Sequence, residues 1–80
     1  MADRSDLQQW VIEALQELSE PSRIADICKH IWEHHERDLR TSGDLFYTWQ
    51  YEMRWAGQQL RNRGALRPVR GRRNQLWELV

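Results

Sequence analysis

The chain has 80 residues and a mass of 9.7 kDa. This length suits a single small domain and excludes barrel and doubly wound enzyme folds, because a second core would need roughly 50 residues of its own. Twelve Lys and Arg residues balance twelve Asp and Glu residues, so the formal net charge is zero, which by itself argues against a polyanionic partner.

The charges are nevertheless segregated along the chain. Residues 1–53 contain five basic and eleven acidic side chains, a formal charge of −6, whereas residues 54–80 contain seven arginines and one acidic residue, a formal charge of +6. Such asymmetry indicates an anionic partner that meets one end of the molecule. The positive charges of the second segment are all arginines, which favour bidentate contacts with phosphate or guanine.

The sequence carries no signal of membrane insertion, disulfide bonding or catalysis. No apolar run exceeds three residues, so we expect no secretory signal, no membrane contact and a cytoplasmic location. Cys28, the only cysteine, cannot form an internal disulfide and is interpreted as a small core residue. Because no Gly-rich phosphate loop, nucleophile elbow or paired carboxylates are visible, we expect neither enzymatic activity nor a cofactor.

The first predicted helix spans about residues 6–19. Ser5 is the predicted N-cap, and Gln8 completes an S-x-x-Q capping box. The helix should end before Pro21. Its apolar side is formed by Leu7, Val11, Ala14, Leu15 and Leu18, with Trp10 on the flank.

A second helix is predicted over about residues 22–37, with Ser22 as its N-cap. His30 and His34 lie one turn apart on one face, which suggests a metal, but no H-E-x-x-H pattern or second ligand cluster accompanies them. We therefore expect no metal site and interpret both as surface imidazoles. A longer connection over residues 38–43 should follow. The predicted buried stripe contains Ile24, Ile27, Cys28, Ile31 and His35.

The third predicted helix spans about residues 44–62 and ends at Arg63-Gly64. Gly57 should allow close approach of another segment, and Trp55 is expected beneath the segment that follows the helix. The predicted apolar stripe contains Leu45, Trp49, Met53, Ala56 and Leu60. The opposite side of the helix carries Tyr47, Gln50, Tyr51, Arg54, Gln58 and Arg61.

After Gly64 the apolar period changes from helical to extended. Two short runs within residues 66–79, separated by Gly71-Arg72-Arg73-Asn74, predict a β-hairpin in which Trp77 and Leu79 face one side. Pro68 has no N–H, so the first run should pair on one side only. The predicted fold is mainly α with a small β-hairpin: three helices followed by a two-stranded wing, in one domain of residues 1–80.

This order of elements resembles a winged helix-turn-helix domain. The stretch from Tyr47 to Leu79 is similar to the N-terminal modules of Mrr-type restriction endonucleases and related stand-alone bacterial proteins, in which a long third helix ends in an R-x-x-G-L-like turn and the wing closes with W-x-L. The matching residues here are Arg61, Gly64, Leu66, Trp77 and Leu79. The resemblance implies a protein of the bacterial cytoplasm or nucleoid that binds DNA without a nuclease domain of its own.

The expected function is therefore DNA binding, by a transcriptional regulator or an accessory DNA-recognition module, with double-stranded DNA as partner. The third helix would enter the major groove, where Arg54 and Arg61 reach guanine or phosphate and Gln50 and Gln58 read adenine. The predicted DNA-binding residues are Tyr47, Thr48, Gln50, Tyr51, Arg54, Gln58 and Arg61 on the helix and Arg67, Arg70, Arg72 and Arg73 on the wing.

Other interpretations of the same residues remain open. A long helix needs a solvated face, and a charged hairpin protects a sheet edge from aggregation. A protein-interaction module, with Tyr47, Tyr51 and the arginines as anchors, is the alternative function. In the DNA-binding interpretation, the acidic N-terminal half would face away from DNA and be free for a homodimer contact or a protein partner.

Overall fold

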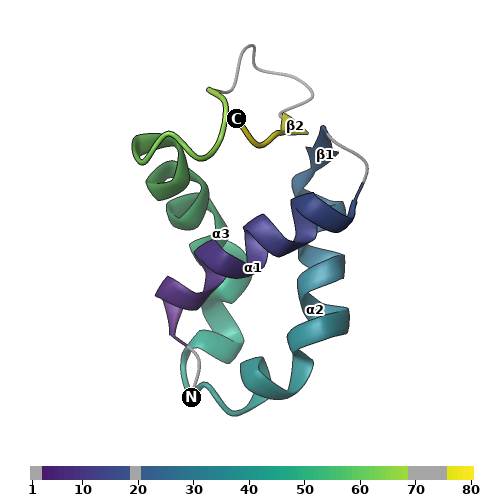
Figure 1. The fold of residues 1–80 in the computed structure, drawn as a ribbon. Helices are drawn as coiled ribbons and strands as arrows, with labels where there is room; N and C mark the ends of the chain where they lie inside the picture. Colours follow the sequence, from purple (N-terminus) through teal and green to yellow (C-terminus); the bar gives the residue numbers. More distant parts are fainter. Residues whose placement is uncertain (1–2, 19–20, 69–75) are drawn as a thin grey trace.

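Three helices and two short strands make up the part of the chain that the computed structural model describes, residues 3–18, 21–68 and 76–80 (Figure 1). In chain order the elements are α1 (Arg4–Glu17), β1 (Ser22–Arg23), α2 (Ile24–Arg40), α3 (Leu45–Asn62) and β2 (Leu76–Trp77). The protein is mainly helical with a small antiparallel sheet, which agrees with the coarse prediction. No helix in these segments is both long and apolar enough to cross a membrane.

The start of α1 differs from the prediction. Asp3 is the N-cap: its side chain accepts a hydrogen bond from the Ser5 backbone N–H at 2.8 Å, and its own N–H donates to Asp6 Oδ2 at 2.9 Å. These reciprocal bonds form a capping box whose carboxylates suit the positive end of the helix dipole. The predicted box at Ser5 is therefore wrong. The helix begins at Arg4 and ends at Glu17, two residues before its predicted end.

A short strand replaces the predicted first turn of α2. Ser22, the predicted N-cap, is buried in β1, so the helix begins at Ile24. At its other end α2 continues to Arg40, three residues beyond the prediction, because the added turn places Leu39 in the core. The predicted long connection is therefore shortened to residues 41–44.

The buried stripe of α2 agrees with the prediction in part. Ile27 and Ile31 are fully buried, and Cys28 packs half-buried against the core. His35 is half-buried as expected, with its ring stacked on Trp10 at a centroid distance of 4.2 Å. Ile24 is exposed, so its predicted place in the core is wrong; it belongs to the first turn of α2, directly after the strand.

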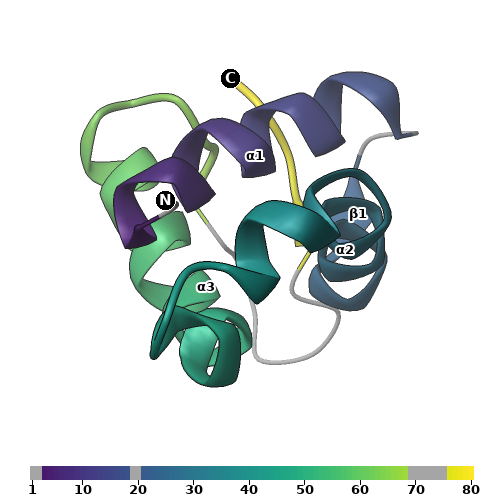
Figure 2. The same ribbon diagram turned by 90° about the horizontal axis from the view of Figure 1, so that it is seen from below.

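The apolar stripe of α3 is confirmed. Trp49, Met53, Ala56 and Leu60 are buried, and Leu45 packs against them from the edge of the core. Figures 1 and 2 show α1 lying across both other helices, and its buried apolar side chains pack in one core with those of α2 and α3. This packing fixes which side of α3 faces inward, and with it the side that faces solvent.

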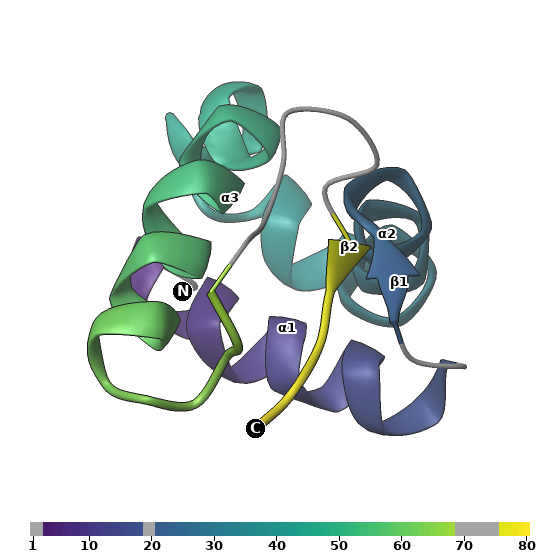
Figure 3. The same cartoon turned by 90° about the horizontal axis from the view of Figure 1, so that it is seen from above.

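The sheet joins segments far apart in the sequence. β1 pairs with β2 in antiparallel register, with Ser22 opposite Trp77 and Arg23 opposite Leu76 (Figure 3). A strand at Ser22–Arg23 was not predicted, because two extended residues between helix signals leave no recognisable period. β2 is consequently held against the start of α2.

The predicted hairpin is present only as a single contact in the described residues. Leu66 and Leu79 form an antiparallel bridge, supported by hydrogen bonds from Arg67 N–H to the Glu78 carbonyl at 2.9 Å and from Val80 N–H to the Ala65 carbonyl at 3.0 Å. The prediction that the two arms of the wing would form the sheet is therefore corrected, since the two-stranded ladder is formed by β1 and β2. The C-terminal segment lies between β1 and residues 65–67.

Candidate nucleic-acid interface

The solvent-facing side of α3 carries the residues predicted to contact a partner. Tyr47 and Tyr51 are 83% and 78% exposed, and Gln50, Arg54 and Gln58 are also exposed. At 3.6 residues per turn, these five side chains lie within about a third of the helix circumference. The structure therefore brings them together on one polar face, which we call the α3 face.

Arg54 is the unpaired cation of the α3 face. Within the described residues its side chain makes no hydrogen bond, ion pair or ring contact. Gln58 is partly engaged, because its Nε2 donates to Asn62 Oδ1 at 3.0 Å. An exposed guanidinium without a carboxylate partner keeps all five of its N–H donors available for a ligand.

Arg61 was predicted to lie on this exposed face, but it does not. Its guanidinium lies over the Trp77 ring, with the carbon Cζ 5.3 Å from the ring centroid, and its Nε is buried without a hydrogen-bond partner in the described residues. Burial lowers the pKa of the Arg61 guanidinium from its ordinary value, yet an arginine remains charged at neutral pH. Arg61 therefore links α3 to β2 at the edge of the α3 face.

A pocket of about 230 Å³ lies beside Arg54 where α2, α3 and β2 meet. Its walls combine two guanidinium groups and one amide with two apolar side chains. Sequence periodicity did not place the apolar members there, because they come from the start of α2 and from β2. The lining residues are Ile24, Arg54, Gln58, Arg61 and Trp77.

Several other basic or polar side chains predicted to bind a partner already have intramolecular partners. Arg67 Nε lies 2.9 Å from Glu78 Oε1 in an exposed ion pair, and Thr48 Oγ1 donates to the Asp44 carbonyl at 3.3 Å. Of the predicted wing residues, Arg70, Arg72 and Arg73 lie outside the described residues. Among the described wing residues, the charge of Arg67 is therefore less available than the sequence alone indicates.

Trp55 differs from its predicted surroundings. It is half-buried against the core, and the guanidinium of Arg4 lies over its ring at 4.4 Å from the centroid. Arg4 also approaches Glu52 Oε2 at 3.8 Å. Trp55 thus packs beside the start of α1, on the flank of α3 away from Arg61.

A second polar cluster joins the end of α1 to the middle of α2. His30 is only 8% exposed, so its interpretation as a surface imidazole is wrong; its Nε2 lies 2.6 Å from Glu17 Oε2. His34 is exposed as predicted, and its Nε2 lies 3.8 Å from the same oxygen. Hydrogen bonding to His30 lowers the pKa of Glu17 from its ordinary value. Sequence spacing identified the two histidines, but not the carboxylate from another helix.

The surroundings of Cys28 predict a thiol that reacts slowly with disulfide reagents. Burial raises the pKa of Cys28, so the reactive thiolate is scarcer at pH 8 than in an exposed cysteine. We expect a disulfide reagent such as Ellman's reagent to react more slowly with the native protein than with the protein in guanidinium chloride, and Cys28→Ser should abolish the reaction. Equal rates in the native and denatured states would contradict this.

Comparison of the chain with protein-family models, curated proteins and solved structures gives no match. Function is therefore inferred from the residues themselves. The α3 face offers one guanidinium that is unpaired among the described residues, two amides and two phenols, groups that donate to phosphate oxygens and to base edges in nucleic-acid complexes.

Proposed function

We propose that the protein is a winged-helix DNA-binding protein that acts as a transcriptional regulator or an accessory DNA-recognition module. The observation that carries this proposal is the α3 face, on which Arg54 is exposed and unpaired within the described residues. An ordinary solvated helix face would distribute carboxylates among its cations, whereas the α3 face has none.

The arrangement of the strands supports the winged-helix interpretation. β1 lies between α1 and α2 in the sequence, and β2 pairs with it, while residues 65–67 bond to the other side of the C-terminal segment. Three extended segments thus adjoin three helices, and the arginine-rich residues 69–75 connect two of those segments. The resemblance to the Mrr-type modules is part of the same proposal.

In the proposed complex, α3 lies in the major groove, whose width of about 12 Å admits a helix. Arg54 contacts a guanine edge or a phosphate, Gln50 and Gln58 contact adenine, and Tyr47 contacts the backbone near the start of the helix. The wing arginines contact phosphate. Arg61 acts indirectly, because its cation–π contact with Trp77 holds β2 beside the α3 face.

Substitution of Arg54 tests this proposal. Arg54→Ala should weaken binding to duplex DNA by about tenfold, the usual effect of losing one good base or phosphate contact. The measurement is a fluorescence-anisotropy titration against several duplexes at a series of salt concentrations. Arg37→Ala is the matched control, because this substitution removes the same charge from an exposed residue in the last turn of α2.

The control distinguishes a specific contact from a change in net charge. Arg37→Ala should leave affinity within about twofold of the original protein, since a remote surface charge changes mainly long-range attraction. Equal losses in the two variants would contradict a contact by Arg54. Absence of binding to every duplex at low salt would overturn the proposed function.

A second candidate function is binding of a protein partner, favoured by the exposure of Tyr47 and Tyr51 one turn apart on α3. Exposed aromatic residues of this kind commonly anchor protein interfaces. The two functions differ in salt dependence: release of counterions makes DNA binding fall steeply with salt, whereas an aromatic interface depends on it weakly.

A further inference from the structure

We propose that Glu17, His30 and His34 form a binding site for a transition-metal dication, and that Zn²⁺ is the metal it binds best. The site would connect the end of α1 to the middle of α2, and it does not depend on the proposed DNA binding. It differs from the expectation drawn from the sequence, in which the two histidines have no third ligand. The third ligand becomes evident only when α1 and α2 pack together.

The three side chains present their ligand atoms to one small volume. One oxygen of Glu17 and one nitrogen from each histidine all lie within 4.8 Å of one another. Ligands bound to tetrahedral zinc at about 2.1 Å are separated by roughly 3.4 Å, so small rotations complete the site. Such rotations are available, because the side chains of Glu17 and His34 are at least half exposed.

The backbone already orients one of the two imidazoles. His34 Nδ1 lies 2.9 Å from the His30 carbonyl oxygen, and since that oxygen can only accept, Nδ1 carries the proton. The lone pair of His34 is therefore on Nε2, the atom nearest Glu17. Histidines that bind metals commonly donate their other ring N–H to a backbone carbonyl in this way.

His30 supplies the less accessible ligand. Its ring is stacked on the ring of His34 with centroids 4.0 Å apart, so both Nε2 atoms can approach the same volume. Its Nδ1 is buried and has no hydrogen-bond partner in the described residues. A site in which this nitrogen has no hydrogen-bond partner should bind metal about 10- to 100-fold more weakly than a site in which both imidazoles are hydrogen-bonded.

The ligand set selects the class of metal. Two imidazoles and one carboxylate suit Zn²⁺ and neighbouring transition metals, whereas Mg²⁺ and Ca²⁺ require mainly oxygen ligands. When a protein supplies three ligands to a zinc ion, the fourth coordination position is left for water. That position has access to solvent, because the side chains of His34 and Glu17 are at least half exposed. A pocket of about 610 Å³ also lies next to His30.

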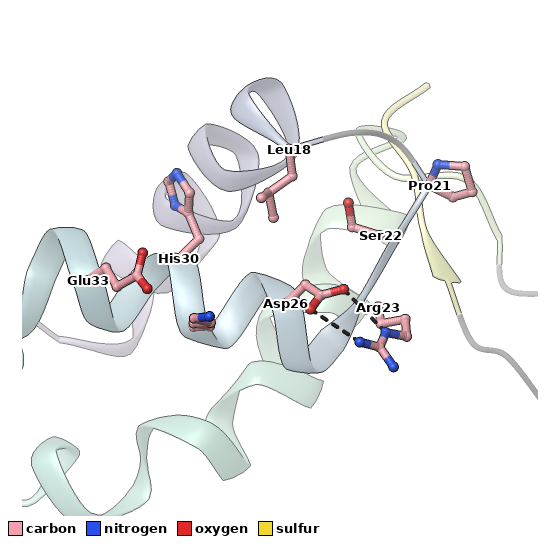
Figure 4. Close-up of a pocket in the computed structure, with 8 residues that line it drawn as sticks. Leu18, Pro21, Ser22, Arg23, Asp26, His30 and Glu33 are labelled. Carbon is pink, nitrogen blue, oxygen red and sulfur yellow. Dashed lines mark hydrogen bonds and ion pairs between the residues drawn. The ribbon is translucent and has the colours of Figure 1, made fainter.

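Figure 4 shows this pocket, in which His30 points from α2 toward α1 beside Leu18. The charges around the pocket are mixed and do not exclude a cation. Arg23 is paired with Asp26, whose Oδ2 lies 3.2 Å from Arg23 Nε, and Glu33 is exposed on the same helix as His30. Lys29 also lines the pocket.

Thermal unfolding with added ZnCl₂ tests the proposed site. A ligand that binds only the folded state raises its stability, and a Zn²⁺ concentration 100-fold above Kd should raise Tm by about 15 °C. MgCl₂ should have no such effect. Equilibrium dialysis should give one bound zinc per chain.

Variants of the two exposed ligands locate the site without disturbing the core. His34→Ala and Glu17→Gln should each weaken zinc binding by about tenfold or more. Glu36→Gln is the matched control for the carboxylate, because Glu36 is also an exposed residue of a helix surface, with a partner, Arg40, outside the proposed site. Cys28→Ser excludes the thiol as the ligand, and zinc binding should persist in this variant.

Three results would overturn the proposal. These are a Zn²⁺-dependent rise in Tm that survives the combined His34→Ala and Glu17→Gln substitutions, a rise abolished by Cys28→Ser, and no binding of zinc in dialysis. None of these results bears on DNA binding, which is measured separately with Arg54→Ala. Loss of DNA binding in turn leaves the metal site unaffected.

Discussion

Replacement of Trp77 by alanine is expected to lower the free energy of unfolding by about 3–5 kcal/mol. The indole is only 4% exposed, packs on Gly57 and has the Arg61 guanidinium over its ring. Its removal leaves a cavity between α3 and β2 and exposes part of the core to water. A domain of this size is stabilised by only about 4–12 kcal/mol, so this variant should lose a large share of its stability.

Denaturant unfolding followed by circular dichroism measures the loss, and the neighbouring residue provides the control. Leu76 precedes Trp77 in β2 and faces the opposite side, where it is 38% exposed. Leu76→Ala should therefore cost less than about 1 kcal/mol. If both substitutions cost the same, the indole does not secure β2 to α3.

Gly57→Ala is expected to destabilise the protein by about 1–3 kcal/mol, although alanine is the better helix former. A Cβ atom at this position would lie 2.7 Å from Cη2 and 2.8 Å from Cζ2 of Trp77. In an open helix position the same substitution would stabilise by about 0.5–1 kcal/mol, so the sign of the change is diagnostic. Denaturant unfolding of the two proteins measures it.

A double-mutant cycle assigns the cost to the indole. In a Trp77→Leu background the added methyl group no longer meets the aromatic ring, and Gly57→Ala should lose most of its penalty. The coupling free energy between the two positions should exceed about 0.5 kcal/mol, as is usual for residues in direct contact. Additive effects would show that Gly57 is required for another reason.

The helices were the most predictable part of the fold, because each buries a periodic apolar stripe. The stripe of α3 was predicted residue by residue, and the close approach at Gly57 agrees with the contact to Trp77. The ends of α1 and α2 were predicted less well. Asp3 and Ser5 are both good N-caps, and the choice between them depends on the reciprocal bond with Asp6.

The exposed residues of α3 were also predictable, since the side opposite a buried stripe must face solvent. The interaction partners of each arginine were not predictable. The sequence predicted the same role for Arg54, Arg61 and Arg67. In the described residues, however, Arg54 is unpaired, Arg61 packs on the Trp77 indole and Arg67 is in an ion pair. The Glu17 contact to His30 likewise depends on how two helices cross, which periodicity within one helix does not specify.

The pairing of β1 with β2 also has a consequence for how the chain folds. Ser22 and Trp77 are 55 positions apart, so this ladder closes a long loop and carries a substantial entropic penalty. Residues in contact between successive helices are closer in sequence, so these contacts carry a smaller entropic penalty. We expect the successive helix pairs, α1 with α2 and α2 with α3, to pack before the sheet forms.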